Sequence, residues 1–427
     1  MQFKKVLFVI LLIFCNLIAF GQVATLDDSA LQVRQRTFDR VWGIVNESHF
    51  DTNFNGVDWK KVGESYRPQA MSANSDSEFY NILNQMIGEL NQSHFSIYTK
   101  ESEVELSKCN EGVIGIDLRL LDNHAVINRV EANSPADKAG IKMGFEITKI
   151  DDRTLPELLL SLENTLAPRK YADGVKQAYR ERVLTRALCG KPETSVKIEV
   201  LDKKNAAKTL NLTRTAYKGE ILKVAEGIPP FKPLFEAKWL ENKIAYISFN
   251  VWIPKQADRV QQAIRSMRDA RGMIIDLRNN AGGQGNLVNN VGGTLFGERV
   301  SFGKTKRRNG EGDFWVLPQD EIYNGKVIIL TNCGTGSTSE IFAAGMKDLG
   351  RATLIGERTA GAVLPANVER LPSGANFLHA VADYRSPSGI LIEGKGIEPN
   401  VEVRLTRQTL LEGRDLQLEE AVRELSK

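Results

Sequence analysis

A short apolar run, followed by small residues and then by a helical pattern, constrains the fold of this chain most strongly. Residues 326–330, Lys-Val-Ile-Ile-Leu, predict a buried strand, and apolar residues recur at helical spacing up to Leu349. Ser337 stands at the turn between them, in the sequence Gly-Ser-Thr-Ser-Glu-Ile. The pattern therefore predicts a strand-to-helix turn that places a serine hydroxyl at a helix start.

Two interpretations of Ser337 are open on this stretch alone. Free backbone N–H groups and the positive end of the helix dipole favour negative charge on a nearby oxygen, as acyl transfer requires. Ser337 and Glu340 also have the spacing of a capping box, in which the serine bonds its own helix and does no chemistry. Because capping boxes are common, the stretch by itself favours the cap.

Strands and helices alternate around this turn. The expected strands are 244–249, 272–277, 352–355, 377–384 and 401–405; the expected helices end at Met267, begin after Asn286 and close the chain at 416–425. This alternation predicts an α/β fold with a parallel sheet. A proline-rich linker at residues 227–233 precedes it.

The first 21 residues have the pattern of a secretory signal peptide. Lys4 and Lys5 precede a thirteen-residue apolar-rich run, and Ala19 and Gly21 supply small residues before a cleavage site near Gly21/Gln22. The run is too short to span a bilayer. Bulky Phe14 before Cys15 argues against a lipid anchor. We expect an exported protein, periplasmic or secreted, with no membrane span in the mature chain.

Composition excludes several classes of function. The formal charge is +3, and removal of the two signal-peptide lysines leaves +1 with no basic run, which argues against nucleic-acid binding. The remaining cysteines, Cys109, Cys189 and Cys333, have neither metal-site spacing nor a disulfide framework. They are interpreted as small buried residues, or as one pair and a free thiol. We expect no metal and no organic cofactor.

Residues 22–100 are expected to form a helical cap. Helical patterns cover residues 30–45, 59–66 and 78–90, with Asn- and Ser-rich turns between them. The sequence Leu-Asn-Gln-Ser-His-Phe at 90–95 then breaks the last helix. His94 is thereby expected in a loop or at the first position of a strand.

Residues 112–118, 126–130, 134–140 and 145–151, in this order, resemble a PDZ domain that closes with strands at 196–201 and 209–212. The resemblance implies that backbone N–H groups of Gly112, Val113, Ile114 and Gly115 receive the terminal carboxylate of a peptide, which adds to the sheet as a strand. A charged, partly helical insertion at about 156–191 interrupts the domain and has no assigned function.

Three motifs together indicate a family. The string Asp-Leu-Arg-Asn-Asn-Ala-Gly-Gly ends at Gly283, just past an expected strand end, where α/β sheets place ligands. With the Ser337 turn and Gly-Glu-Arg-Thr-Ala-Gly at 356–361, it resembles the carboxyl-terminal processing (tail-specific) protease family. The resemblance implies a mixed multidomain α/β chain with a signal peptide (1–21), helical cap (22–100), PDZ-like domain (101–215) and crotonase-like spiral protease core (216–427).

By the same resemblance Ser337 matches the nucleophile, and the N–H groups of Gly282 or Gly283 and of Thr338 match the oxyanion hole. The family's Ser-Lys dyad has lysine where this chain has Ala362, and a methyl group cannot accept a proton.

An unassisted serine is a weak nucleophile, so another base is needed. His94 stands where the tricorn core protease branch has its Ser-His pair, and Glu393 matches that branch's glutamate. His94 would then be the base, with Ser93 and Glu393 orienting it, and Lys395 is a less favoured substitute.

The sequence thus predicts an exported serine endopeptidase that cleaves proteins or peptides with free C-termini, near those termini. An alternative from another class is a catalytically degenerate ligand- or peptide-binding protein on the same fold, which the loss of lysine at Ala362 motivates. Acyl-CoA chemistry on the same core is disfavoured by the PDZ domain and by export. Oligomeric state has no sequence signal.

Overall fold

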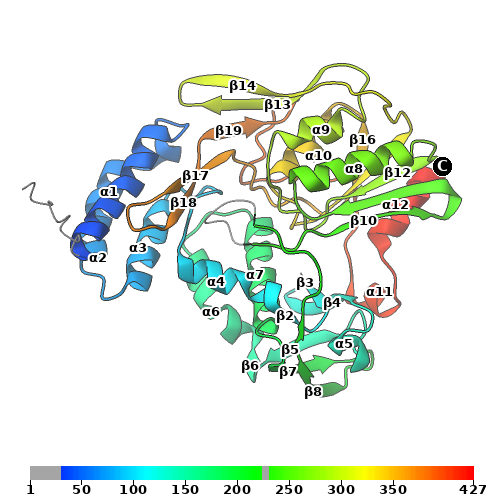
Figure 1. Ribbon diagram of the computed structural model, residues 1–427, viewed down its shortest axis with the longest axis horizontal. Helices are drawn as coiled ribbons and strands as arrows, with labels where there is room; N and C mark the ends of the chain where they lie inside the picture. The colour runs from blue at the N-terminus through cyan, green and yellow to red at the C-terminus, as the bar shows by residue number, and fades with distance from the viewer. Residues whose placement is uncertain (1–29, 224–229) are drawn as a thin grey trace, which may run out of the picture.

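The computed structural model describes residues 30–223 and 230–427 (Figure 1). The predicted signal peptide, and the part of the proline-rich linker before residue 230, lie outside the described residues. Among the described helices, none combines the length and apolar character needed to cross a bilayer.

A six-stranded sheet carries the Ser337 turn. The strand order is β10-β11-β12-β15-β16-β20, and every neighbouring pair is parallel except β10 with β11. The strands span Phe235–Leu240, Ile244–Phe249, Gly272–Asp276, Lys326–Thr331, Ala352–Gly356 and Val401–Glu402. The predicted parallel sheet is confirmed. Antiparallel β10 was not predicted; it is a largely exposed edge strand.

Helices cover both faces of this sheet. Buried residues of α8 (Pro254–Ser266), α9 (Leu287–Gly292) and α10 (Thr338–Asp348) share one core with alternate residues of β11, β12 and β15. The other residues of the same strands pack against α12 (Leu416–Ser426). Because both faces are covered, the central strands are continuous apolar runs.

Two small sheets join this core to the N-terminal helices. One has the order β14-β13-β19, the other β1-β18-β17. Their strands span Gly310–Val316, Val300–Arg307, Ala382–Arg385, Ser96–Tyr98, Asn376–Ala380 and Ala366–Arg370. The prediction of one strand over 377–384 was wrong, because the chain leaves one sheet at Val381 and enters the other.

The N-terminal helices α1 (Ala30–Ser48), α2 (Trp59–Met71) and α3 (Asp76–Gly88) match the expected helical regions. A single 3-10 turn, Phe54–Gly56, lies between α1 and α2. Their core also contains Leu371 and Phe377 from the C-terminal half, and β1 pairs with β18 in antiparallel register. The loop after α3 is thereby held against the protease core (Figure 1).

The PDZ region is a sheet of order β3-β4-β5-β7-β8, with β6 paired to β5. The strands span Ile116–Leu121, His124–Val130, Glu146–Ile150, Ser195–Leu201, Ala207–Thr213 and Arg153–Thr154. Helices α4 (Lys100–Glu111), α5 (Pro135–Lys138), α6 (Leu155–Leu166) and α7 (Asp173–Leu188) surround it. The insertion predicted as partly helical therefore forms α6 and α7.

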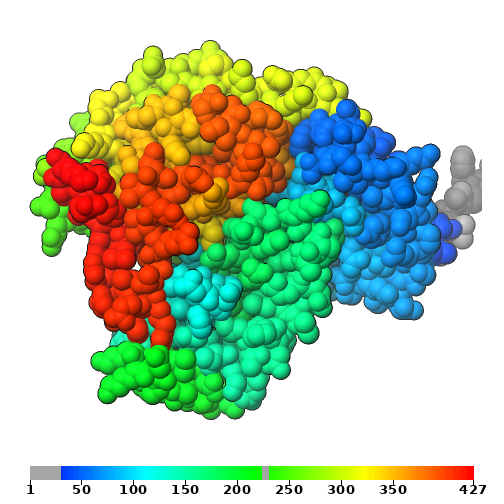
Figure 2. Space-filling model, turned by 180° about the vertical axis from the view of Figure 1, so that it is seen from behind, coloured from blue at the N-terminus to red at the C-terminus, as the bar shows by residue number. Residues whose placement is uncertain are grey.

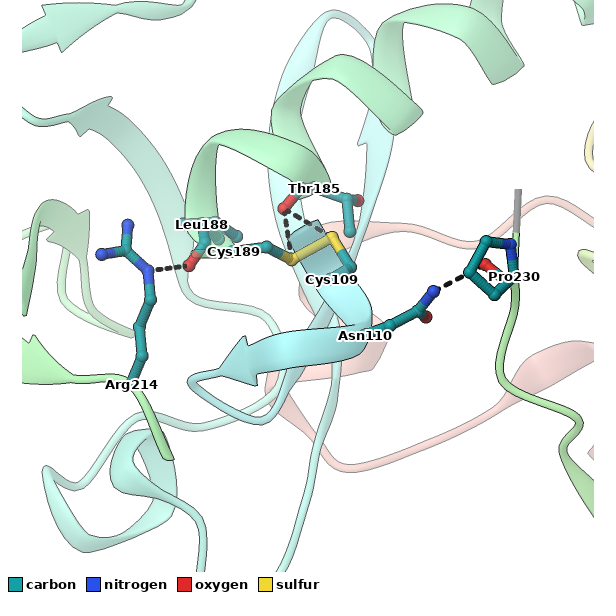
Figure 3. The surroundings of a disulfide bond; sticks show 7 residues. All are labelled: Cys109, Asn110, Thr185, Leu188, Cys189, Arg214 and Pro230. Carbon is teal, nitrogen blue, oxygen red and sulfur yellow. Dashed lines mark hydrogen bonds between the residues drawn. A yellow bond between two sulfur atoms is a disulfide. The ribbon is translucent and has the colours of Figure 1, made fainter. Parts of the chain in front are cut away.

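One disulfide fixes the ends of two PDZ-region helices. Cys109 in α4 is bonded to Cys189 directly after α7, and both sulfur atoms lie near the Thr185 carbonyl oxygen (Figure 3). Cys333 is free and buried. The pair that the sequence left open is therefore Cys109–Cys189, and Cys333 is a small buried residue as expected.

The C-terminal segment spans the PDZ region and the core. After β20 the chain forms α11 (Arg407–Leu411), and Arg407 donates hydrogen bonds to the carbonyl oxygens of Gly144 (3.0 Å) and Asp202 (2.9 Å). Figure 2 shows this red segment lying on the PDZ region. It holds the two regions together on the side opposite the view of Figure 1.

Candidate active site

Ser337 occupies a backbone conformation that is unusual for a residue with a side chain. It immediately precedes α10, with φ 55° and ψ −123°. Such a positive φ costs free energy and persists only where surrounding contacts hold it. Here the Ser337 N–H donates to the Ala362 carbonyl oxygen (2.8 Å) and to Glu340 Oε2 (3.2 Å). The turn is thus held from the backbone, and the hydroxyl is directed away from its own helix.

The two interpretations of Ser337 can now be separated. The residue has the position and the Glu340 partner of a capping box, but its side chain makes no cap hydrogen bond to the helix. Instead Ser337 Oγ lies 3.2 Å from His94 Nε2. The helix is capped through the Glu340 carboxylate, and the hydroxyl faces an imidazole.

Two backbone N–H groups beside Ser337 are candidates for an oxyanion hole. A side-chain carbon at Gly282 would lie 2.5 Å from Ser337 Cβ and 2.9 Å from the Thr338 nitrogen, so only glycine leaves this space open. The Thr338 hydroxyl donates to the Gly283 carbonyl oxygen (2.8 Å) and orients that peptide. Within residues 30–223 and 230–427, the N–H groups of Gly283 and Thr338 have no protein acceptor.

Gly282 and Gly283 differ in one respect that the sequence left open. The Gly282 N–H donates to Asn280 Oδ1 (3.1 Å) and is therefore already satisfied. Gly283 has φ 147°, and a side chain there would collide with the Trp252 carbonyl oxygen. Of the two glycines, Gly283 is therefore the one whose backbone N–H has no acceptor among the described residues.

His94 lies in the loop between α3 and β1. Of the two positions expected from the sequence, a loop or the start of a strand, the loop is the one observed. The φ of His94, 60°, is also in the left-handed region. The loop is anchored from behind, because buried His49 Nε2 is bonded to Gln92 Oε1 (2.8 Å). The imidazole thereby reaches a serine 243 positions away in the sequence.

A hydrogen-bonded chain continues from the far side of the imidazole. Ser93 Oγ lies 2.7 Å from His94 Nδ1 and donates to Glu393 Oε2 (2.9 Å). Glu393 also accepts from the N–H groups of Ser93 (2.7 Å) and Val363 (2.9 Å). Because the Ser93 proton is directed to the carboxylate, His94 Nδ1 must donate to Ser93 Oγ. His94 Nε2 then carries the lone pair that faces Ser337.

Burial shifts the ionisation of this chain. Removal of the imidazole from water lowers the pKa of His94 from 6.5 to about 4. Burial also raises the pKa of Glu393, although hydrogen bonds from Ser93 and Val363 oppose this. A neutral imidazole is therefore the form present near pH 7, and it can accept a proton.

Glu340 has a structural role that the sequence did not predict. Its carboxylate accepts from Thr359 Oγ1 (2.5 Å), from the N–H groups of Gly361 (2.7 Å) and Ala362 (2.9 Å), and from Ser337. Burial raises its pKa to about 7 against these bonds. Glu340 ties the Ser337 turn to the 359–362 loop, and only its capping-box spacing was visible in the sequence.

The remaining candidate bases lie elsewhere. Ala362 contributes its carbonyl oxygen to the Ser337 N–H, and Lys395 is exposed at the surface. His124 is bonded to Glu146 and His379 lies 3.4 Å from Ser48 Oγ. Asn400 bonds the backbone of Leu354 on β16. None of these side chains contacts Ser337 in the described parts of the chain.

The predicted carboxylate-binding loop is built into the PDZ region. Gly112 and Val113 form β2, which pairs with β9 (Thr215–Ala216). Ile114 is buried, and Gly115 has φ 83° where a side chain would contact Ser134. Peptide binding by these residues stays a prediction.

Comparison with known proteins agrees with this architecture. Residues 243–403 match the model of peptidase family S41, residues 32–88 the tricorn protease C1 domain, and residues 112–212 the PDZ domain. Similar relatives include carboxyl-terminal-processing peptidase 3, chloroplastic, of Arabidopsis thaliana (24% identical, covering 91% of this chain and 74% of the relative). Another is the carboxyl-terminal-processing protease of Synechocystis sp. (25%, covering 87% and 81%).

A solved structure, the photosystem II D1 C-terminal processing protease, shares the fold with a TM-score of 0.58 at 20% identity, covering 92% of this chain and 97% of that one. The fold and the matched models define a serine peptidase. More specifically, residues 243–403 match peptidase family S41, the regions before them match a tricorn-type N-terminal region and a PDZ domain, and similar relatives are named carboxyl-terminal-processing proteases.

Proposed function

We propose that this protein is an exported serine endopeptidase that cleaves protein substrates near their carboxyl termini, with Ser337 as nucleophile and His94 as base. The observation that carries the proposal is the 3.2 Å separation of Ser337 Oγ and His94 Nε2. A general base must lie within hydrogen-bond reach of the proton it removes. The hydrogen-bonded tautomer of His94 supports the same assignment.

Acylation follows from these contacts. Ser337 Oγ attacks the substrate carbonyl carbon while His94 Nε2 accepts the hydroxyl proton. The imidazolium then donates this proton to the leaving amine as the C–N bond breaks, which leaves an acyl-serine. In the second half, water adds to the acyl carbon, gives a proton to His94, and the Ser337 oxygen leaves with that proton. Each half returns the imidazole to its starting state.

The oxyanion that forms in each half has candidate donors. The N–H groups of Gly283 and Thr338 flank Ser337 and are not used within the described protein. Donors that are oriented before the reaction stabilise developing charge more than mobile water does. We assign the oxyanion hole to this pair, with Gly282 as the residue that keeps the space open.

Ser93 and Glu393 have the role of positioning residues. Glu393 does not contact the imidazole but acts through Ser93 Oγ. A carboxylate at this position fixes the Nδ1–H tautomer and stabilises the imidazolium that forms during the reaction. It thereby opposes the burial that lowers the pKa of His94.

Cleavage near carboxyl termini and export rest on separate observations. A PDZ domain is suited to bind a free peptide terminus, here through the N–H groups of residues 112–115. The Cys109–Cys189 disulfide supports an oxidising compartment outside the cytoplasm. The predicted signal peptide also supports export.

The proposal is tested by incubating wild-type protein and the Ser337→Ala variant with an unstructured protein substrate, with mass spectrometry of the products. We expect wild type alone to release carboxyl-terminal fragments. Equal cleavage by both proteins would refute the proposal. A fluorophosphonate probe should label wild type and neither Ser337→Ala nor His94→Ala. Labelling that survives in His94→Ala would assign the base elsewhere, with Lys395 the next candidate.

A further inference from the structure

A large cavity lies between the PDZ region and the protease core. Its volume is about 680 Å³, and its wall is formed by α4, β3 and α7 on one side and by β10 and β11 on the other. Ala281, the residue before Gly282, also lines it. The cavity therefore extends from the PDZ region to the neighbourhood of the proposed oxyanion hole.

Two arginines of α7 face this cavity without an ionic partner. Arg182 and Arg186 both line the wall. In the part of the chain that the structure describes, neither makes a hydrogen bond or an ion pair, and the Arg182 guanidinium lies over the Tyr179 ring. The other charged side chains of the wall are neutralised: Asp117 with Arg129, Glu181 with Arg119, Glu236 with Lys238, and Arg278 with Asp276.

The spacing of the two arginines makes their arrangement costly. Residues four apart lie on the same face of a helix, and like charges at this spacing destabilise it. Arg186 is half-buried, and burial together with the neighbouring charge of Arg182 lowers its pKa. The acid whose charge acts on it, Glu105, is already paired with Lys108. An anion in the cavity would relieve this repulsion.

The edge of β3 indicates how an extended chain could lie beside these arginines. β3 ends the PDZ sheet, so one of its edges has no strand partner. At Leu120 that edge is occupied, because the N–H donates to Glu181 Oε1 (2.9 Å) and the carbonyl accepts from Gln177 Nε2 (3.0 Å). At the other end, Gly190 bridges Gly112. Helix α7 therefore runs antiparallel to β3, with Arg182 and Arg186 beside the part of the strand before Leu120.

The disulfide fixes the position of Arg186. Cys189 follows it by three residues, and its bond to Cys109 joins the end of α7 to α4 (Figure 3). Cys109 and Thr185 also line the cavity. The cationic end of α7 is consequently held at the cavity wall by a covalent bond.

We infer that this cavity selects protein substrates with an acidic carboxyl-terminal tail, and that Arg182 and Arg186 bind a carboxylate of that tail. The inference deepens the proposed function and rests on it only for the cleavage that follows binding. Apolar residues Leu106, Leu118 and Phe235 line the same cavity and would contact neighbouring side chains. The carboxylate is that of an Asp or Glu side chain, because the chain terminus is assigned to the N–H groups of residues 112–115.

Binding is measured on the full chain carrying Ser337→Ala, so that the peptides are not consumed. The probes are fluorescent decapeptides that differ only in Glu or Gln near the end, each with a free or an amidated carboxyl terminus. By fluorescence anisotropy we expect the acidic peptide to bind about tenfold more tightly than its neutral analogue, as for a charge-assisted contact. Loss of affinity on exchange of Glu for Gln reports the side-chain contact, and loss of affinity on amidation reports binding of the terminus by residues 112–115.

The arginines are tested by Arg182→Gln with Arg186→Gln in the same background. The ratio of the affinities for the acidic and the neutral peptide should fall to about one. Lys176→Gln, which removes a charge from the same helix outside the cavity, should leave this ratio unchanged. Arg186→Glu should instead favour peptides with Lys near the end. Thermal unfolding by circular dichroism checks that each variant is folded.

Two outcomes would overturn the inference: acidic and neutral peptides binding wild-type cavities equally, or a preference that persists in the double arginine variant. Because the measurement needs no turnover, a protein that shows the preference but cleaves nothing would refute the proposed function and leave the inference standing. A protein that cleaves its substrates but shows no preference for acidic peptides would refute the inference and leave the proposed function standing.

Discussion

The two halves of the candidate site are held in different ways. The Ser337 turn is a local feature, in which a strand, a turn and a helix follow one another within residues 326–348. The His94 loop has no such support from its own sequence, and it is positioned by Gln92 bonded to His49 and by Glu393, 300 positions away from Ser93. The proposed nucleophile is therefore placed by a local strand-turn-helix segment that the 359–362 loop braces, whereas the proposed base is placed entirely by contacts between distant parts of the sequence.

This difference shows how the proposed site would function without the dyad lysine. A lysine at position 362 would belong to the same core as the serine and would need no second region. With Ala362 there, the proton acceptor comes from the N-terminal region, which is joined to the core by pairing of β1 with β18. In the proposed mechanism the N-terminal helices are thus part of the catalytic unit.

The largest expected effect comes from removing the base. His94→Ala should lower kcat/KM by about 10²- to 10⁴-fold, because general-base catalysis contributes that much. Initial rates on a fluorogenic peptide measure this, with His124→Ala, an exposed histidine paired to Glu146, as the matched control. A loss of less than tenfold would place the base in the core instead.

A smaller loss is expected from the positioning residues. Glu393→Gln and Ser93→Ala should each lower kcat by roughly tenfold to 10²-fold and change KM little, since neither group touches substrate. Because Glu393 acts through Ser93, the double variant should lose less than the product of the two single losses. Multiplicative effects would indicate that the two residues act independently.

The pH profile distinguishes a buried base from an exposed one. His94 must be neutral to accept a proton, so activity should fall as pH decreases through its pKa of about 4. At pH 5.5 most activity should remain, whereas an unperturbed histidine of pKa 6.5 would leave about a tenth. Values of kcat/KM from pH 4.5 to 8, with circular dichroism at each pH, test this. An acidic limb near 6.5 would contradict the burial of the imidazole.

The smallest effect is expected for Lys395. The side chain is exposed, and Lys395→Ala should change kcat/KM by less than about threefold, within the range of surface substitutions. Fluorophosphonate labelling should also be unchanged. A loss comparable to that of His94→Ala would restore a lysine-dependent mechanism and remove the contrast between the two halves.

Much of the fold follows from sequence periodicity. The alternating apolar runs of the core and the three N-terminal helices have strong local patterns, and the structure contains them. The sequence did not predict the β13–β14 hairpin or β10. Their strands are largely exposed, and their structure depends on the strands with which they pair. The residue types of the site were also visible, but the hydrogen bonds among them join positions hundreds of residues apart.

The sequence by itself determined that Ser337 stands at a helix start and that Ala362 cannot accept a proton. It left the capping and nucleophile interpretations open, because both need a serine at that position. The tertiary structure decided the geometry: the Ser337 hydroxyl faces His94, Gly283 has the free N–H, and Ser93 links the imidazole to Glu393. It did so because the pairing of β1 with β18 holds the N-terminal region against the core that contains Ser337.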